Sequence, residues 1–128
     1  MSTRRRPGFT LIELLIVVVI VGILAAFAIP KFQATKGKAN AASLRSDIRN
    51  LATAQEAYFY EHATYSNNLA ALNFNGSPGV IFTFGVATAG GWQAKVTHPL
   101  AYPIECALFV GGVPAYAPAS IEGLVACQ

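Results

Sequence analysis

The stretch Gly8–Pro30, GFTLIELLIVVVIVGILAAFAIP, decides how this chain is organised. Its central run, Leu14–Ile29, contains no polar side chain. Coiled as a helix, the stretch would be roughly 30 Å long, which is the thickness of the hydrocarbon core of a bilayer. We therefore expect residues 9–30 to form a transmembrane helix. One carboxylate, Glu13, stands near the start of this helix, where an ionised side chain is costly unless it is paired.

The composition agrees with a chain that meets lipid or protein as well as water. Hydrophobic residues make up 54% of the 128 residues and charged residues only 12%, whereas a soluble domain usually has about 25% charged residues. The net charge of +3 comes from an N-terminal tag: Arg4–Arg6 supply three of the nine Lys and Arg residues, and the other six balance the six Asp and Glu residues. A nucleic-acid partner is possible, but no clustered basic patch supports it.

Three arginines before an apolar run are typical of an export signal and would keep the N-terminus in the cytoplasm. Ordinary secretory cleavage after the small residues Ala26 and Ala28 is one route, and it would leave a soluble protein that starts at Ile29. The other route keeps the span in the protein. The length of the run favours the second route, since the apolar core of an ordinary signal has about 7–15 residues.

The same stretch resembles the prepilin leader junction of type IV pilins and the related pseudopilins. The matching residues are Gly8 before the cut, Phe9 after it, Glu13, and an apolar helix that contains Gly22 and Pro30. The resemblance implies that residues 1–8 are a leader peptide and that a membrane-embedded prepilin peptidase cuts between Gly8 and Phe9. It implies N-methylation of the new amino terminus on Phe9. It also implies that the subunits form a homo-oligomeric helical filament, built by an assembly machinery in the inner membrane.

Charge pairing independently suggests an assembly role for Glu13. Cleavage would create a cationic amine on Phe9, and residues four apart share a helix face. Glu13 could therefore neutralise the amine of its own chain or, in a filament, the amine of a neighbouring subunit. The alternative is a carboxylate that reaches the membrane surface and has no role in assembly.

Gly22 and Pro30 predict a flexible section of the helix. Glycine destabilises a helix by about 1 kcal/mol, and proline removes a backbone hydrogen bond and clashes with the preceding turn. The segment between them could kink or unwind when the helix leaves lipid for the core of a filament.

Residues 31–62 are predicted to be an amphipathic second half of the same helix. We expect Lys31, Lys36 and Lys38 to contact lipid headgroups or water. Most of the aromatic residues of AYFYEHATY are expected to pack beneath the β-rich region. The buried stripe is expected to consist of Ala41, Leu44, Ile48, Leu51, Ala52, Gln55, Tyr58, Phe59 and His62, and the opposite face of Arg45, Asp47, Arg49, Asn50 and Glu56.

The remainder of the chain predicts a loop over residues 63–79 and a β-sheet head over residues 80–128. Three alternating runs, 80–87, 92–98 and 104–110, predict antiparallel strands, and the first two form a hairpin. The last six residues are expected to form a short edge strand. The predicted fold class is therefore α+β: a long N-terminal helix packed against an antiparallel sheet of three to four strands, which is the pilin fold that the resemblance implies.

The alternation also predicts which side of the sheet faces the helix. Trp92, Ala94 and Val96 are expected on the apolar face, and Gln93 on the opposite face. The third strand is expected to add Ile104, Cys106, Leu108 and Val110 to the apolar face.

Cys106 and Cys127 are the two cysteines of the chain. An even number of cysteines in an exported protein favours a disulfide, and two unrelated buried thiols are the alternative. Their placement resembles the disulfide-bounded C-terminal region of type IV pilins. Such a bond would tether the tail to the third strand.

No phosphate loop, nucleophile elbow or paired-carboxylate site is present in the sequence, so we predict neither an enzyme nor a cofactor. His62 and His98 are single residues, and two cysteines with two distant histidines do not predict a metal site. Major pseudopilins of type II secretion typically carry acidic C-terminal loops that bind calcium. After residue 61 the only acidic residues are Glu105 and Glu122, too few carboxylates for such a site.

The sequence therefore predicts a structural subunit of a type IV pilus-like surface filament that supports adhesion, motility or DNA uptake. Before assembly the subunit would span the cytoplasmic membrane once. The first alternative is a pseudopilin or minor pilin of a type II secretion or competence system. The second is a monomeric membrane-anchored binding protein, which predicts no assembly and tolerance of Glu13→Ala.

Overall fold

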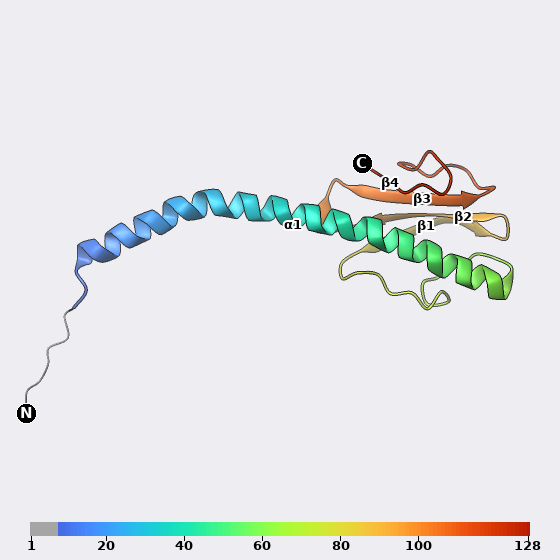
Figure 1. Ribbon diagram of the computed structural model, residues 1–128, viewed down its shortest axis with the longest axis horizontal. Helices are drawn as coiled ribbons and strands as arrows, with labels where there is room; N and C mark the ends of the chain where they lie inside the picture. Colours follow the sequence, from blue (N-terminus) through green and yellow to red (C-terminus); the bar gives the residue numbers. More distant parts are fainter. Residues whose placement is uncertain (1–7) are drawn as a thin grey trace, which may run out of the picture. The chain divides into compact units, whose positions relative to one another are not determined.

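The computed structural model describes residues 8–128 (Figure 1). Within these residues, one long α-helix, α1, runs from Leu11 to His62. By its internal contacts the chain divides into two compact units, Met1–Thr35 and Lys36–Gln128. The first part of α1 belongs to the N-terminal unit, and the rest of α1 and all strands belong to the C-terminal unit. The predicted leader lies outside the described residues except for Gly8.

The C-terminal unit contains a four-stranded antiparallel sheet in the order β1-β2-β3-β4. The α+β class and the antiparallel sheet predicted from the sequence are thus confirmed. The strands are β1 Ile81–Thr88, β2 Gly91–Thr97, β3 Glu105–Gly111 and β4 Ala126–Cys127, with a 3-10 helix, η1 Pro99–Ala101, between β2 and β3.

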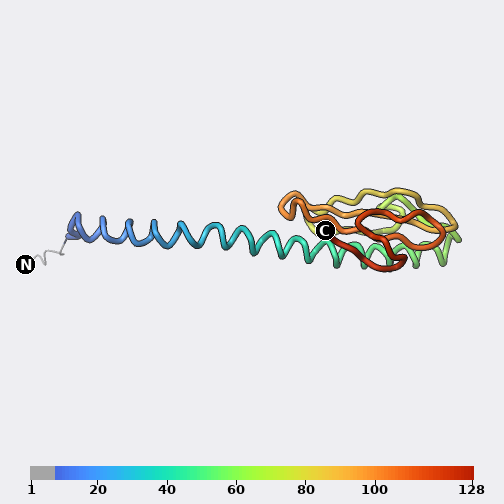
Figure 2. The backbone as a smooth tube through the Cα atoms, turned by 90° about the horizontal axis from the view of Figure 1, so that it is seen from above, coloured from blue at the N-terminus to red at the C-terminus, as the bar shows by residue number. Residues whose placement is uncertain are grey.

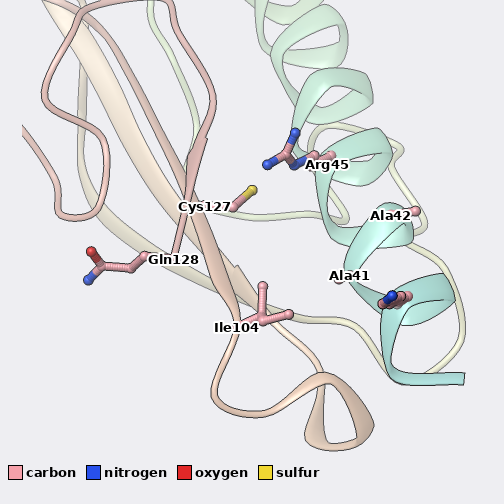
Figure 3. A pocket seen from close by; sticks show the side chains of 7 residues that line it. Ala41, Ala42, Arg45, Ile104, Cys127 and Gln128 are labelled. Atoms are coloured by element: carbon pink, nitrogen blue, oxygen red, sulfur yellow. The ribbon is translucent and has the colours of Figure 1, made fainter. Parts of the chain in front are cut away.

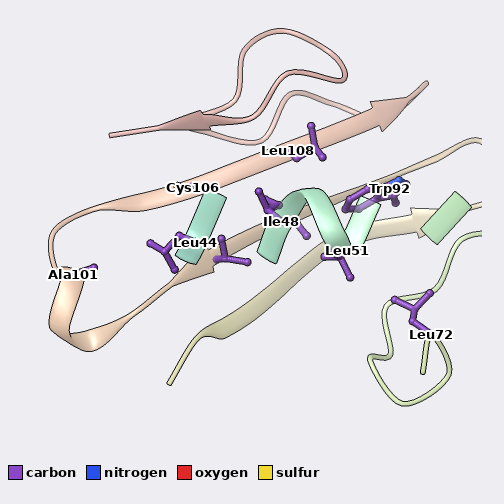
Figure 4. Close-up of a cluster of buried hydrophobic side chains, with 10 residues drawn as sticks. Leu44, Ile48, Leu51, Leu72, Trp92, Ala101, Cys106 and Leu108 are labelled. Atoms are coloured by element: carbon purple, nitrogen blue, oxygen red, sulfur yellow. The ribbon is translucent and has the colours of Figure 1, made fainter. Parts of the chain in front are cut away.

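One face of the sheet packs on the second half of α1 (Figure 4). Leu44, Ile48 and Leu51 recur every three or four residues and have no exposed surface. They meet Trp92 of β2 and Cys106 of β3, which are also fully buried. Complete burial of a large apolar side chain stabilises a fold by about 1.5–3 kcal/mol. The centre of the helix stripe and the apolar faces of β2 and β3 are therefore where the sequence predicts them.

Gln93 lies on the opposite face of the sheet, as predicted, but this face is covered as well. The chain after β3 folds back along the sheet (Figure 2), where Phe109 and Ala119 belong to a second buried cluster. Gln93 is only 6% exposed. Its side-chain amide lies 3.1 Å from the Val86 nitrogen, from which it accepts, and 3.3 Å from the Pro114 carbonyl, to which it donates. A polar residue can occupy this face because β1 supplies one partner, the Val86 N–H, and the tail supplies the other, the Pro114 carbonyl.

A disulfide holds the tail against β3. It joins Cys106 to Cys127, which are cross-strand partners in the sheet. Next to it, Glu105 and Gln128 exchange two backbone hydrogen bonds of 2.9 and 3.0 Å. The structure therefore contains the expected bond, and the alternative of two separate thiols is wrong.

Asp47 corrects the expected polar face of the helix. Its carboxylate is only 4% exposed and accepts hydrogen bonds from the Ser77 backbone nitrogen at 2.8 Å and from Ser77 Oγ at 3.0 Å. A buried carboxylate needs such partners, because losing water is costly for a charge. Asp47 therefore fastens the connection between α1 and β1 to the helix.

Asp47→Ala is expected to lower the free energy of unfolding by about 2 kcal/mol, because the half-buried Ser77 N–H loses its acceptor. Asp47→Asn should cost less, since its amide oxygen still accepts one bond. Urea unfolding followed by the fluorescence of buried Trp92 measures both. Asn50→Ala, at an exposed position of the same helix, is the control and should change stability by less than about 0.5 kcal/mol. Equal stabilities of the Asp47→Ala and Asn50→Ala variants would contradict the anchoring role.

Most of the aromatic residues near the end of α1 pack as expected, with one exception. Tyr58 and Tyr65 contact the core, and the ring of Phe59 stacks on Tyr65 with 4.6 Å between centroids. Tyr60, however, is 92% exposed. His62, which was assigned to the buried stripe, is exposed and stacks on Tyr58 at 4.0 Å. The stripe therefore ends before the last turn of the helix.

Tyr65 predicts a pH dependence of stability. Burial raises the pKa of Tyr65 above its ordinary value of 10.0, and the hydrogen bond to Glu56 and the charge of Glu56 raise this pKa further. The resulting stability is fully present below the ordinary tyrosine pKa and is lost as the pH rises through the higher folded value. Above pH 10, urea unfolding should show stability falling more steeply in the parent than in Tyr65→Phe. Tyr60→Phe should keep the parent's slope, and parallel curves for Tyr65→Phe and the parent would contradict this prediction.

Candidate functional site

The start of α1 holds the candidate functional site. Phe9 and Thr10 precede the helix, which begins at Leu11. The carboxylate of Glu13 accepts hydrogen bonds from the Thr10 backbone nitrogen at 2.9 Å and from Thr10 Oγ1 at 2.7 Å. In return, the Glu13 backbone nitrogen donates to Thr10 Oγ1 at 3.3 Å. This reciprocal pair is a capping box, and a threonine cap typically stabilises a helix by about 0.5–2 kcal/mol.

Sequence reasoning missed the capping box, although the signal was readable. Thr10-Leu11-Ile12-Glu13 has the Thr-x-x-Glu spacing directly before an apolar run, which is the signature of the motif. Phe9 is joined to Gly8 by a peptide bond and has no free amine, and Thr10 satisfies the carboxylate of Glu13. Glu13 is therefore held in a defined position at the head of the helix.

The apolar side chains that follow are exposed within the N-terminal unit. From Phe9 to Phe32, every large hydrophobic side chain is more than half exposed, from 51% for Val17 to 84% for Leu11. Within residues 8–128, α1 is the one helix long and apolar enough to cross a membrane, with a mean hydropathy of 3.1 over its most apolar window. An apolar surface of this extent requires lipid or other protein chains around it.

The helix continues without interruption through Gly22 and Pro30. A Cβ atom added at Gly22 would meet no other atom within 4 Å, so no close contact within the described chain requires a glycine there. The role of Gly22 and Pro30 in helix flexibility stays a prediction.

The C-terminal unit carries a hollow of about 450 Å³ between α1 and the end of β4 (Figure 3). Arg45 lies across this hollow from Cys127. Among the described residues, the ion pair is between Lys95 and Glu105, at 2.7 Å, and no group of three His, Cys, Asp or Glu side chains could hold a metal ion. The hollow is lined by Lys38, Ala41, Ala42, Arg45, Ile104, Cys127 and Gln128.

Comparison with known proteins identifies relatives of this chain. Residues 3–29 match the family model of the prokaryotic N-terminal methylation motif. Over 110 residues, the chain is 36% identical to the type IV major pilin protein PilA of Myxococcus xanthus, covering 86% of this chain and 48% of that protein. The chain belongs to the type IV pilin family. This family is one of structural subunits.

Two further relatives are a pilus component and a secretion-system protein. The type IV wide pilus major component of Thermus thermophilus is 42% identical over 69 residues, which are 54% of this chain and 53% of that protein. The type II secretion system core protein G of Pseudomonas aeruginosa is 36% identical over 72 residues, which are 56% of this chain and 51% of that protein. The chain thus spans about half the length of the curated relatives it matches.

Proposed function

We propose that this chain is a structural subunit of a type IV pilus-like surface filament, which supports adhesion, motility or DNA uptake. The observation that carries the proposal is the start of α1. There the capped carboxylate of Glu13 follows the Gly8–Phe9 junction and heads an apolar helix with its side chains exposed. Such a helix can be surrounded by lipid in a membrane or by identical helices in a polymer. The similarity to the Myxococcus xanthus major pilin supports this proposal.

The proposal includes a maturation step and two locations. The precursor spans the cytoplasmic membrane once through residues 9–30, in contact with lipid. A prepilin peptidase removes residues 1–8 by cutting between Gly8 and Phe9, and the new amine on Phe9 is methylated. The assembly machinery of the inner membrane then moves the subunit into a homo-oligomeric filament at the cell surface.

In this proposal Glu13 changes partner during assembly. Thr10 satisfies its carboxylate in the precursor. Cleavage creates a cationic amine on Phe9, and an incoming subunit can neutralise its Glu13 with the amine of a subunit already in the filament. An unpaired charge among apolar helices is costly, so only the register that pairs the two groups is stable.

The proposed flexibility between Gly22 and Pro30 can be tested by hydrogen exchange. In assembled filaments we expect the amides of residues 23–29 to exchange faster than those of residues 14–21, because a helix that unwinds there exposes its N–H groups. The precursor in detergent, where α1 is continuous, is the control. Equal, full protection of both segments in the filament would contradict the flexible section.

The second candidate is a pseudopilin or minor pilin of a type II secretion or competence system. The similarity to the type II secretion system core protein G of Pseudomonas aeruginosa favours it. Shearing cells that produce the chain together with its assembly machinery separates the two candidates. Abundant surface fibres built of this chain support the pilus subunit, whereas expression at the same level without fibres supports the secretion or competence role. A membrane-anchored monomer would never assemble.

A further inference from the structure

We propose that the C-terminal unit has a lipid-binding surface, which lies on the headgroups of a bilayer with anionic phospholipids before assembly. We call it the basal surface and define it by Lys38, Leu100, Tyr102 and Ile104. The inference rests on the membrane stage of the proposed function, and it adds a second membrane contact outside the apolar helix.

The basal surface brings together α1 and the connection between β2 and β3. The Leu100 carbonyl oxygen lies 3.7 Å from the position that a Cβ atom on Gly37 would occupy. This contact places the connection beside Lys38 on the helix. Ile104 lines both the hollow of about 450 Å³ that contains Lys38 and a second hollow of about 270 Å³ that contains Tyr102. The two hollows are therefore parts of one surface.

The side chains of this connection are presented outwards by a fixed backbone. Leu100 is 66% and Tyr102 is 86% exposed, whereas Ala101 between them is only 3% exposed. The His98 ring accepts a hydrogen bond at 3.0 Å from the Leu100 backbone nitrogen and so caps η1. A leucine and a tyrosine exposed two residues apart fit a membrane interface, where tyrosine is enriched because its ring is apolar and its hydroxyl is polar.

The chain length keeps the basal surface close to the membrane. Gly37 follows Phe32, the last large exposed hydrophobic residue of the N-terminal unit, by only five positions. Five residues rise about 7 Å in a helix and cannot exceed roughly 18 Å even when extended. The headgroup region adds roughly 5–8 Å on each side of the hydrocarbon core. Gly37, and the connection that contacts it, are therefore within reach of the headgroups.

The local charge fits an anionic partner. Between Glu13 and Asp47 the sequence contains no acidic residue but has the basic residues Lys31, Lys36, Lys38 and Arg45. Glu105 lines the second hollow, but it forms an ion pair with Lys95 at 2.7 Å. Basic residues next to a membrane span are attracted to anionic headgroups. This charge, continuous in sequence with the apolar run, favours a lipid surface over a second copy of the chain as the partner.

Fluorescence quenching in vesicles tests the basal surface. The full chain with Tyr102→Trp is inserted into vesicles that contain phosphatidylglycerol and lipids brominated near the headgroup. We expect about a twofold loss of the added emission, because an interfacial side chain samples the brominated region. Trp92 is fully buried, and the parent chain corrects for its emission. Tyr60→Trp, at a 92% exposed position two residues before the end of α1, is the matched control and should not be quenched.

A third reporter, Phe27→Trp, shows whether the apolar helix is inserted. Quenching of this reporter and of the Tyr102→Trp reporter supports the proposal, and adding Lys38→Gln should then weaken quenching at position 102 in anionic vesicles but not in neutral ones. If Phe27→Trp is quenched and Tyr102→Trp behaves like Tyr60→Trp, the basal surface is refuted while the membrane stage stands. If Phe27→Trp is not quenched, both the basal surface and the membrane stage are refuted. Shielding of the Tyr102→Trp reporter only in purified filaments would assign the surface to a second copy and overturn the lipid contact.

Discussion

Replacing Glu13 by glutamine is expected to lower filament yield by at least about tenfold, because it leaves the Phe9 amine without its counter-charge among apolar helices. Glutamine has nearly the size of glutamate and can still occupy the last position of a capping box. The variant therefore removes the charge while it keeps the start of the helix. The measurement is the amount of the chain in sheared fibres, compared with the amount in whole cells.

Two neighbouring variants separate the charge from the cap. Thr10→Val removes the hydroxyl bonds but leaves the charge of Glu13, and its cost should be limited to a cap worth about 0.5–2 kcal/mol. Glu13→Ala removes both the charge and the cap, and its filament yield should fall as far as that of Glu13→Gln. In every variant, cleavage between Gly8 and Phe9 is followed by mass, so that failed maturation is not mistaken for failed assembly. A normal fibre yield from Glu13→Gln would rule out charge pairing.

Removing the disulfide with Cys106→Ala and Cys127→Ala together is expected to lower the free energy of unfolding by about 3 kcal/mol, because the bond closes a loop between residues 21 apart. β4 has only two residues, so the tail depends on this bond to stay on β3. Loss of the tail would also expose Phe109, which belongs to the cluster on the outer face of the sheet.

Urea unfolding of the whole chain in detergent, followed by Trp92 emission, measures this cost. Ile121→Ala is the control in the same tail, because Ile121 is 60% exposed and its truncation removes little buried surface. It should change stability by less than about 1 kcal/mol. A double cysteine variant as stable as Ile121→Ala would show that the backbone hydrogen bonds beside the disulfide hold the tail alone.

The elements with a regular apolar period were predictable from the sequence. The spacing of Leu44, Ile48 and Leu51 and the alternation around Trp92 and Cys106 each define a buried face. These faces follow from local periodicity, which does not depend on the contacts that distant segments make. The long helix, the antiparallel sheet and the core between them follow from those patterns.

The errors fall where a distant segment supplies the partner. Asp47 is polar and looks exposed by period alone, yet the Ser77 region covers it. Gln93 is on the face predicted for it, but the cover that the tail around Pro114 provides there was not predicted. The paths of these irregular segments have no sequence period, so their contacts could not be predicted. The capping bond between Thr10 and Glu13 is a different case, because the local motif was present and was not recognised.

The most direct test of the whole account is the mass of the subunit in purified fibres. We expect a chain that begins at Phe9, carries one added methyl group on its amino terminus, and retains the disulfide between Cys106 and Cys127. Fibres made of an uncut chain, or a mature protein that starts at Ile29, would contradict the processing site, the pairing of Glu13 and the assembly through residues 9–30 together.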